Sequence, residues 1–145
     1  MIAIGCDHAG VELKKEVIRY LTEKGFELKD MGTDGEPCDY PNMAKTVCGL
    51  VTSGECEKGI LICGTGIGMS IAANKIKGIR AAVCSDSFSA KFTRLHNDSN
   101  IMCMGARVLG SGLACELAEI FVTTGFEGGR HQRRIDLITD IENEN

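Results

Sequence analysis

Short apolar runs alternate along the chain with stretches in which apolar residues recur every three or four positions. The first pattern predicts a buried strand and the second an amphipathic helix. Residues 11–24 show the helical pattern, because Leu13, Val17 and Leu21 fall on one face before Gly25 ends the helix. The same rules predict strands at 1–6, 26–31, 59–63, 79–84 and 101–104. They predict further helices at 41–53, 69–75, 87–96, 112–124 and 130–145.

This alternation of strands and helices predicts an α/β fold. Repeated βα units form parallel sheets whose two faces are covered by helices, and right-handed crossovers leave few possible topologies. We therefore expect one domain over residues 1–145, with three α/β/α layers. The expected sheet is doubly wound, with five parallel strands in the order 2-1-3-4-5 when the strands are numbered along the chain.

The terminal helix differs from the others because it is mostly polar. Its apolar stripe is thin and consists of four residues, Ile135, Leu137, Ile138 and Ile141. So little apolar surface cannot pack strongly on the same subunit. We expect the helix, at about 130–143, to lie at a subunit interface.

Composition narrows the classes of partner. The hydrophobic fraction of 43% and charged fraction of 25% are those of an ordinary globular protein. A net charge of −4 gives no general attraction to nucleic acid or to an anionic membrane, so any phosphate must be held by a local group of donors. No apolar run has membrane-spanning length, and the first residues lack the basic and apolar regions of a signal peptide. We expect a cytoplasmic protein.

Eight cysteines need an explanation, and most lie within apolar runs, where a free thiol serves as a small core residue. No C-x-x-C pair occurs, which disfavours zinc ribbons and redox pairs. The three histidines, His8, His96 and His131, show no H-x-x-x-H spacing, so no metal site is expected.

In doubly wound sheets, ligands bind beyond the carboxyl ends of the strands, where the strand order reverses. The loops that meet there are 6–10, with Asp7 and His8, and 64–68, with three glycines. Bare backbone N–H groups in such a glycine loop can hold a phosphate or an enediolate oxygen. A dinucleotide fingerprint fits poorly, because Met69 stands at the third glycine position. A plain tight turn is the remaining alternative.

Two further features allow both a functional and a structural interpretation. Cys63 ends a strand beside the glycine loop, where a thiolate would be stabilised, but it could equally be another core cysteine. Arg130 and Arg134 lie one helical turn apart and suit a phosphate dianion, but they could also form a solvated basic face. Tyr40 could line a site or simply begin a helix.

Taken together, these residues resemble the ribose-5-phosphate isomerase B family. The matching stretches follow one another across nearly the whole chain: GCDHAG (5–10), DYP (39–41), CGTGIGMSIAANK (63–75), LHND (95–98), GARVLG (105–110) and FEGGRHQRRI (126–135). Each piece alone is weak, whereas the combination is specific. The one departure noted is Cys6, where many relatives have serine, and it adds a second thiol near the site.

The resemblance implies a flavodoxin-like subunit that works as a homodimer or a dimer of dimers, with active sites shared between subunits and with no metal or organic cofactor. It implies interconversion of ribose 5-phosphate and ribulose 5-phosphate through a cis-enediolate, a reaction of the pentose phosphate pathway. Small sugar phosphates are the implied partners, without nucleic acid or membrane.

The resemblance also implies a role for each matching residue. Cys63 would be the base that moves the proton between C2 and C1. Relatives without this cysteine use a glutamate at the position of Met69, and a methionine there cannot act as a base. His96 would help to open the furanose ring, and Thr65 would assist near the substrate hydroxyls. The remaining substrate-binding residues would be Asp7 and Asn97 on the sugar, His8, Arg130 and Arg134 on the phosphate, Arg107 and Tyr40 nearby, and the N–H groups of Gly64, Thr65, Gly66, Ile67 and Gly68 on the enediolate.

Other functions stay open at this point. Related enzymes act on allose 6-phosphate or galactose 6-phosphate, and the full residue set favours the pentose. A non-catalytic sugar-phosphate or nucleotide-binding module on the same architecture is the alternative of another class.

Overall fold

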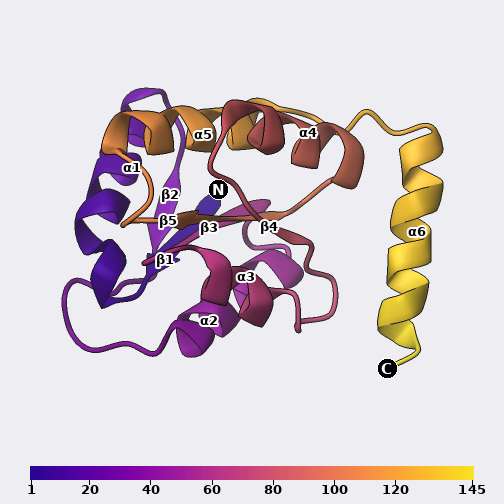
Figure 1. Ribbon diagram of the computed structural model, residues 1–145, viewed down its shortest axis with the longest axis horizontal. Helices are drawn as coiled ribbons and strands as arrows, with labels where there is room; N and C mark the ends of the chain where they lie inside the picture. Colours follow the sequence, from indigo (N-terminus) through magenta and orange to yellow (C-terminus); the bar gives the residue numbers. More distant parts are fainter.

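A parallel β-sheet between two layers of helices forms the body of the protein (Figure 1). The computed structural model describes residues 1–145. The strands are β1 (Ile2–Cys6), β2 (Leu28–Asp30), β3 (Lys58–Cys63), β4 (Ala81–Val83) and β5 (Ile101–Gly105). The helices are the short 3₁₀ turn η1 (His8–Gly10), α1 (Val11–Glu23), α2 (Tyr40–Thr52), α3 (Ile67–Ala73), α4 (Ser87–Asn97), α5 (Ser111–Thr123) and α6 (Arg130–Asn143). The predicted α/β/α class is therefore confirmed, and every predicted element is present.

The lateral order of the last two strands was predicted wrongly. The sheet has the order β2-β1-β3-β5-β4, so β5 and not β4 lies beside β3. Burial gives the physical reason. All five residues of β5 are buried, as a strand with two neighbours requires, whereas β4 has only three residues and Val83 is 44% exposed. The position of β1 beside β3 is unaffected, so the expected reversal of strand order is still found there.

Two apolar clusters hold the layers together. Ile4, Ile60 and Met102 are paired across the three central strands and face α1 and α5. The next residues along β3 and β5, Leu61 and Cys103, face α2 and α3 instead. This alternation follows from the two-residue period of a strand. In Figure 1, α1, α4 and α5 accordingly cover one face of the sheet and α2 and α3 the other.

Helix α6 lies apart from these layers, at the right of Figure 1. A hollow of about 800 Å³ separates it from the body, lined by Ile138 and Ile141 on the helix and by Ile79 and Ala81 opposite. Its contacts with the body are few: His131 and Ile135 are buried, while Leu137, Ile138 and Ile141 keep 46–60% of their surface exposed. No helix in the structure is both long enough and apolar enough to cross a lipid bilayer.

Candidate active site

Two loops meet at the carboxyl edge of the sheet, as expected. The backbone N–H of Asp7, just after β1, donates to the carbonyl of Ile62 in β3 at 3.1 Å. The Asp7 carboxylate accepts the N–H of Ala9 at 2.9 Å, which begins η1 and leaves His8 exposed. Asp7 and His8 are thereby held beside the loop that follows Cys63.

Cys63 ends β3 with its thiol turned toward that loop. The N–H of Gly66 donates to its sulfur, with an N–S distance of 3.1 Å, although the side chain is only 6% exposed. A hydrogen bond of this kind stabilises negative charge on the acceptor. The N–H groups of Gly64 and Thr65 donate to no protein acceptor, so they are free for a ligand.

Glycine is required in this loop for two separate reasons. Gly66 has a φ of 83°, a left-handed conformation in which an L side chain is strained. At Gly68, a Cβ atom would lie 2.7 Å from the ring of Tyr40, so the absent side chain lets the tyrosine pack on the loop. Arg107 also lies against the loop, since a Cβ on Gly64 would be 3.3 Å from its Nη1.

Burial raises the pKa of three other cysteine thiols that lie in or beside the strands. It raises the pKa of Cys6 to about 11 and that of Cys84 to about 11. It also raises the pKa of Cys103 well above its usual value. These three thiols stay protonated near neutral pH and act as core residues. Cys6, the second thiol near the site, instead donates to the carbonyl of Thr33 at 3.6 Å.

The remaining predicted residues lie at the opposite edge of the sheet. Helix α4 follows β4 and returns antiparallel to the strands, so His96 and Asn97 at its end lie at the amino edge. A hydrogen bond of 2.9 Å confirms this position, because Nε of Arg80, just before β4, donates to the carbonyl of Asn97. Arg130 starts α6 at the same edge.

We call the two groups the carboxyl-edge half-site and the amino-edge half-site. The first contains Asp7, His8, Tyr40, Cys63, the loop 64–68 and Arg107. The second contains His96, Asn97, Arg130 and Arg134. One chain does not bring the two half-sites together.

Two residues without a predicted role, Glu127 and His131, border the amino-edge half-site. The rings of His96 and His131 stack with centroids 4.1 Å apart, and Nε2 of His96 is 3.6 Å from Oε2 of Glu127. Burial lowers the pKa of His131, and the nearby charges of His96 and Arg130 lower it further.

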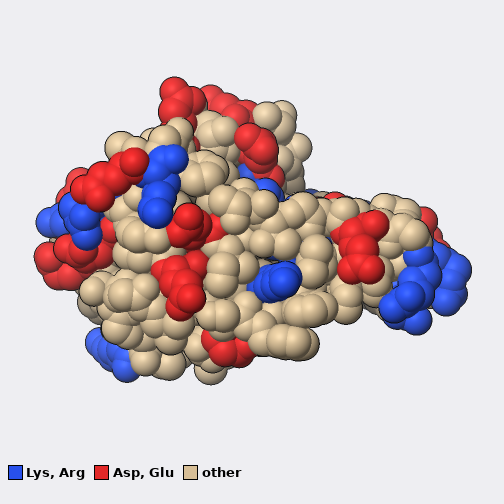
Figure 2. Space-filling model, turned by 90° about the horizontal axis from the view of Figure 1, so that it is seen from above, with Lys and Arg blue, Asp and Glu red and all other residues tan.

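Arg130 and Arg134 form no ion pair and are exposed. Figure 2 shows Lys and Arg side chains gathered at the outer end of the part that projects from the body. The arginines of α6 are therefore available to an anion.

The chain is similar to known proteins over nearly its whole length, which includes the residues of both half-sites. A model of the family described as "Ribose/Galactose Isomerase" matches residues 2–138. Ribose-5-phosphate isomerase B of Escherichia coli is 51% identical over 142 residues, which cover 97% of this chain and 95% of that protein. The solved structure of ribose-5-phosphate isomerase B from Clostridium thermocellum matches with a TM-score of 0.96 at 49% identity, covering 99% of this chain and 97% of that chain. The same enzyme from Mycoplasma genitalium, solved with bound ribulose-5-phosphate, matches with a TM-score of 0.93 at 39% identity, covering 99% and 97% of the two chains.

Proposed function

Because this chain belongs to the ribose/galactose isomerase family, we propose that it interconverts ribose 5-phosphate and ribulose 5-phosphate through a cis-enediolate, with Cys63 as the base. The names of the Escherichia coli relative and of the two solved structures support the pentose substrate. The observation that carries the mechanism is the Cys63 sulfur, hydrogen-bonded to Gly66 beside two free backbone N–H groups.

The chemistry requires a base and a site for developing negative charge, because a proton next to a carbonyl is only weakly acidic. Cys63 takes the proton from C2 of the open-chain aldose, the electron pair of that C–H bond forms the C1–C2 double bond, and the π pair of the C1 carbonyl moves onto O1 to give the enediolate. The N–H groups of loop 64–68 stabilise the enediolate oxygen. Cys63 then returns the proton to C1, while a proton passes from O2 to O1 with the help of Thr65.

The other predicted residues bind and prepare the sugar. His96 moves a proton between the anomeric hydroxyl and the ring oxygen, which opens the furanose. Asp7 and Asn97 contact the sugar, and Tyr40 and Arg107 border the glycine loop. The phosphate is held by His8, Arg130 and Arg134, which fix the reacting carbons without distorting them.

This assignment requires two copies of the chain. Since Cys63 and His96 lie at opposite edges of one sheet, a complete site forms only where the carboxyl-edge half-site of one subunit faces the amino-edge half-site of its partner. A two-fold homodimer makes two such sites, and a dimer of dimers makes four. The exposed apolar stripe of α6, with Ile141 60% exposed, supports an interface at this helix.

A coupled assay for ribulose 5-phosphate formation tests the proposal. We expect Cys63→Ala to abolish turnover while ribose 5-phosphate still binds, as measured by calorimetry, because the sulfur is needed only for proton transfer. Thr46→Ala, at an exposed position on α2, is the control and should retain wild-type turnover. Unchanged turnover in Cys63→Ala would exclude the proposed base.

The family description also names galactose isomerases, so a six-carbon substrate is the second candidate. Measuring kcat/KM for ribose 5-phosphate, allose 6-phosphate and galactose 6-phosphate on the same preparation ranks the three. A higher kcat/KM for a hexose phosphate would change the assigned substrate but leave Cys63 as the proposed base. Binding of ribose 5-phosphate without turnover, or a thermal shift with a nucleotide alone, would instead favour the non-catalytic alternatives.

A further inference from the structure

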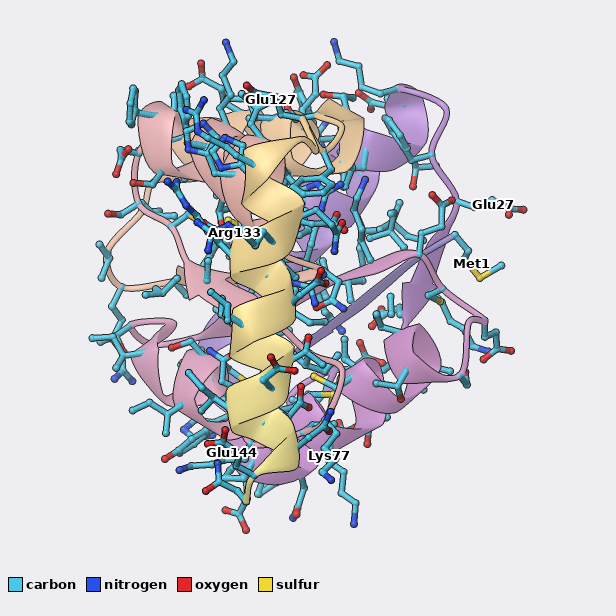
Figure 3. All side chains as sticks on the ribbon, turned by 90° about the vertical axis from the view of Figure 1, so that its right-hand side faces the viewer. Met1, Glu27, Lys77, Glu127, Arg133 and Glu144 are labelled. Atoms are coloured by element: carbon cyan, nitrogen blue, oxygen red, sulfur yellow. The ribbon has the colours of Figure 1, made fainter.

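Three potential metal ligands meet where α4 and the start of α6 come together. They are His96, Glu127 and His131, and one ligand atom from each lies within 4.8 Å of the other two. Figure 3 shows Glu127 at the end of α6 that adjoins the upper helical layer, with Glu144 at the far end. A backbone hydrogen bond of 3.0 Å from the Glu127 N–H to the carbonyl of Leu95 holds the segment against α4.

One atom of this group lacks the partner that its burial requires. His131 is 4% exposed, and its Nε2 forms no hydrogen bond. Buried side-chain nitrogens are paired in the large majority of cases. The neighbouring His96 ring stacks on His131 at 4.1 Å and does not supply the missing bond.

Two imidazoles and one carboxylate form a donor set typical of zinc and similar ions, with a position left for water. Bonds of about 2.0–2.2 Å place such donors about 3.3–3.6 Å apart, so the group must contract by about 1 Å. The His96 ring must also turn out of its stack on His131, because the lone pair of an imidazole nitrogen lies in the plane of the ring. The side chains of His96 and Glu127 can move, because they are 37% and 54% exposed. Mg²⁺ and Ca²⁺ are disfavoured because they prefer oxygen ligands.

Charge around the group limits the affinity but does not forbid a cation. Arg130 and Arg134 lie close enough to act on His131 and oppose positive charge. The carboxylate of Glu127 offsets part of this repulsion. A transition-metal ion, whose bonds to imidazole are partly covalent, suits these surroundings better than an ion held by charge alone.

We propose that His96, Glu127 and His131 bind a divalent transition-metal ion such as Zn²⁺, and that the bound ion inhibits the enzyme by occupying the ring nitrogen of His96. The inhibition rests on the proposed function, because it requires His96 to open the sugar ring. Metal binding itself does not depend on that function.

Co²⁺ is the probe for binding, because its visible spectrum reports its ligands and the chain contains eight competing cysteines. Titration of the full-length, metal-free protein should produce Co²⁺ bands without the near-ultraviolet charge-transfer band of a thiolate ligand. Loss of an outer-shell partner typically weakens metal binding about 10–100-fold, so Glu127→Gln, which removes a direct ligand, should cost at least tenfold. Glu144→Gln, an equal charge change on an exposed residue near the chain end, should bind as the wild type does.

The isomerase assay then tests inhibition. Zn²⁺ should lower the rate of the wild-type enzyme and EDTA should restore it, while Glu127→Gln should need at least about tenfold more Zn²⁺ for the same fractional loss. A thiolate band, or equal Co²⁺ binding by wild type and Glu127→Gln, would overturn the metal site. Thiolate-free binding without loss of activity would overturn the inhibition. An inactive metal-free enzyme that still binds Co²⁺ through this site would count against the proposed function alone.

Discussion

Replacing Gly66 with alanine tests how far the glycine loop depends on its backbone. The residue has a φ of 83°, and an added Cβ would lie 2.9 Å from the carbonyl carbon of Met104 and 2.9 Å from Cγ2 of Val83. The left-handed conformation costs an L residue about 1–2 kcal/mol. Overpacking adds about 1–3 kcal/mol, because the Met104 backbone in the central strand β5 cannot move aside.

We therefore expect Gly66→Ala to lower the free energy of unfolding by about 2–5 kcal/mol in denaturant titration. The variant should also lose kcat, because the displaced Gly66 N–H no longer reaches the sulfur of Cys63. Gly49→Ala is the matched control. That glycine lies within α2 with nothing within 4 Å of an added Cβ, so alanine should stabilise the protein by about 0.5–1 kcal/mol. Stability and kcat of Gly66→Ala close to those of the wild type would refute the reasoning.

Two further substitutions test the phosphate site and the packing below the first loop. Arg134→Ala should raise KM for ribose 5-phosphate about 10–100-fold, since a hydrogen bond to a charged group is worth about 1.5–3 kcal/mol. Arg133→Ala is the control and should change KM little. An unchanged KM in Arg134→Ala would show that Arg134 does not bind the phosphate. Burial lowers the pKa of Lys14, but hydrogen bonds and charge from Asp30 and Asp34 outweigh it and leave the pKa raised above 10.5. Lys14→Met should therefore lower the free energy of unfolding by about 1–3 kcal/mol near pH 7, less than for a fully buried pair because both carboxylates are partly exposed. This difference should be fully present from neutral pH up to about pH 10.4 and shrink as the pH rises through the raised pKa. A difference that stays constant over this range would show that the ion pairs do not cause it.

Hydrophobic periodicity was sufficient to predict every helix and strand but not the lateral order of the sheet. Local patterns identify a strand, but its place in the sheet depends on burial. A strand inside the sheet has both faces and both edges covered, whereas an edge strand has one edge free. Predicted strand length pointed the other way, because the run at 79–84 is longer than the run at 101–104, whereas the structure shortens the first to Ala81–Val83 and extends the second to Ile101–Gly105. Chain order alone led to the wrong placement of β4.

The site was predictable in its first half and less so in its second. The meeting of the Asp7 loop with the loop after Cys63 follows from topology, since both continue from adjacent parallel strands. His96 was predicted as a site residue but not placed at the opposite edge, which the structure shows because α4 returns antiparallel to the strands. The contact of Glu127 with His96 could not be predicted, because the segment between α5 and α6 has no regular structure to fix its course.

Mixing two inactive variants tests the central claim most directly, namely that each active site combines Cys63 of one subunit with His96 of the other. Cys63→Ala and His96→Ala homodimers should each be strongly impaired. After dissociation and reassociation in equal amounts, half of the dimers are hybrids, and each hybrid has one intact site. Activity should then return to about a quarter of the wild-type value per subunit. A mixture that shows no more activity than the two variants measured separately, although hybrids have formed, would contradict the shared site.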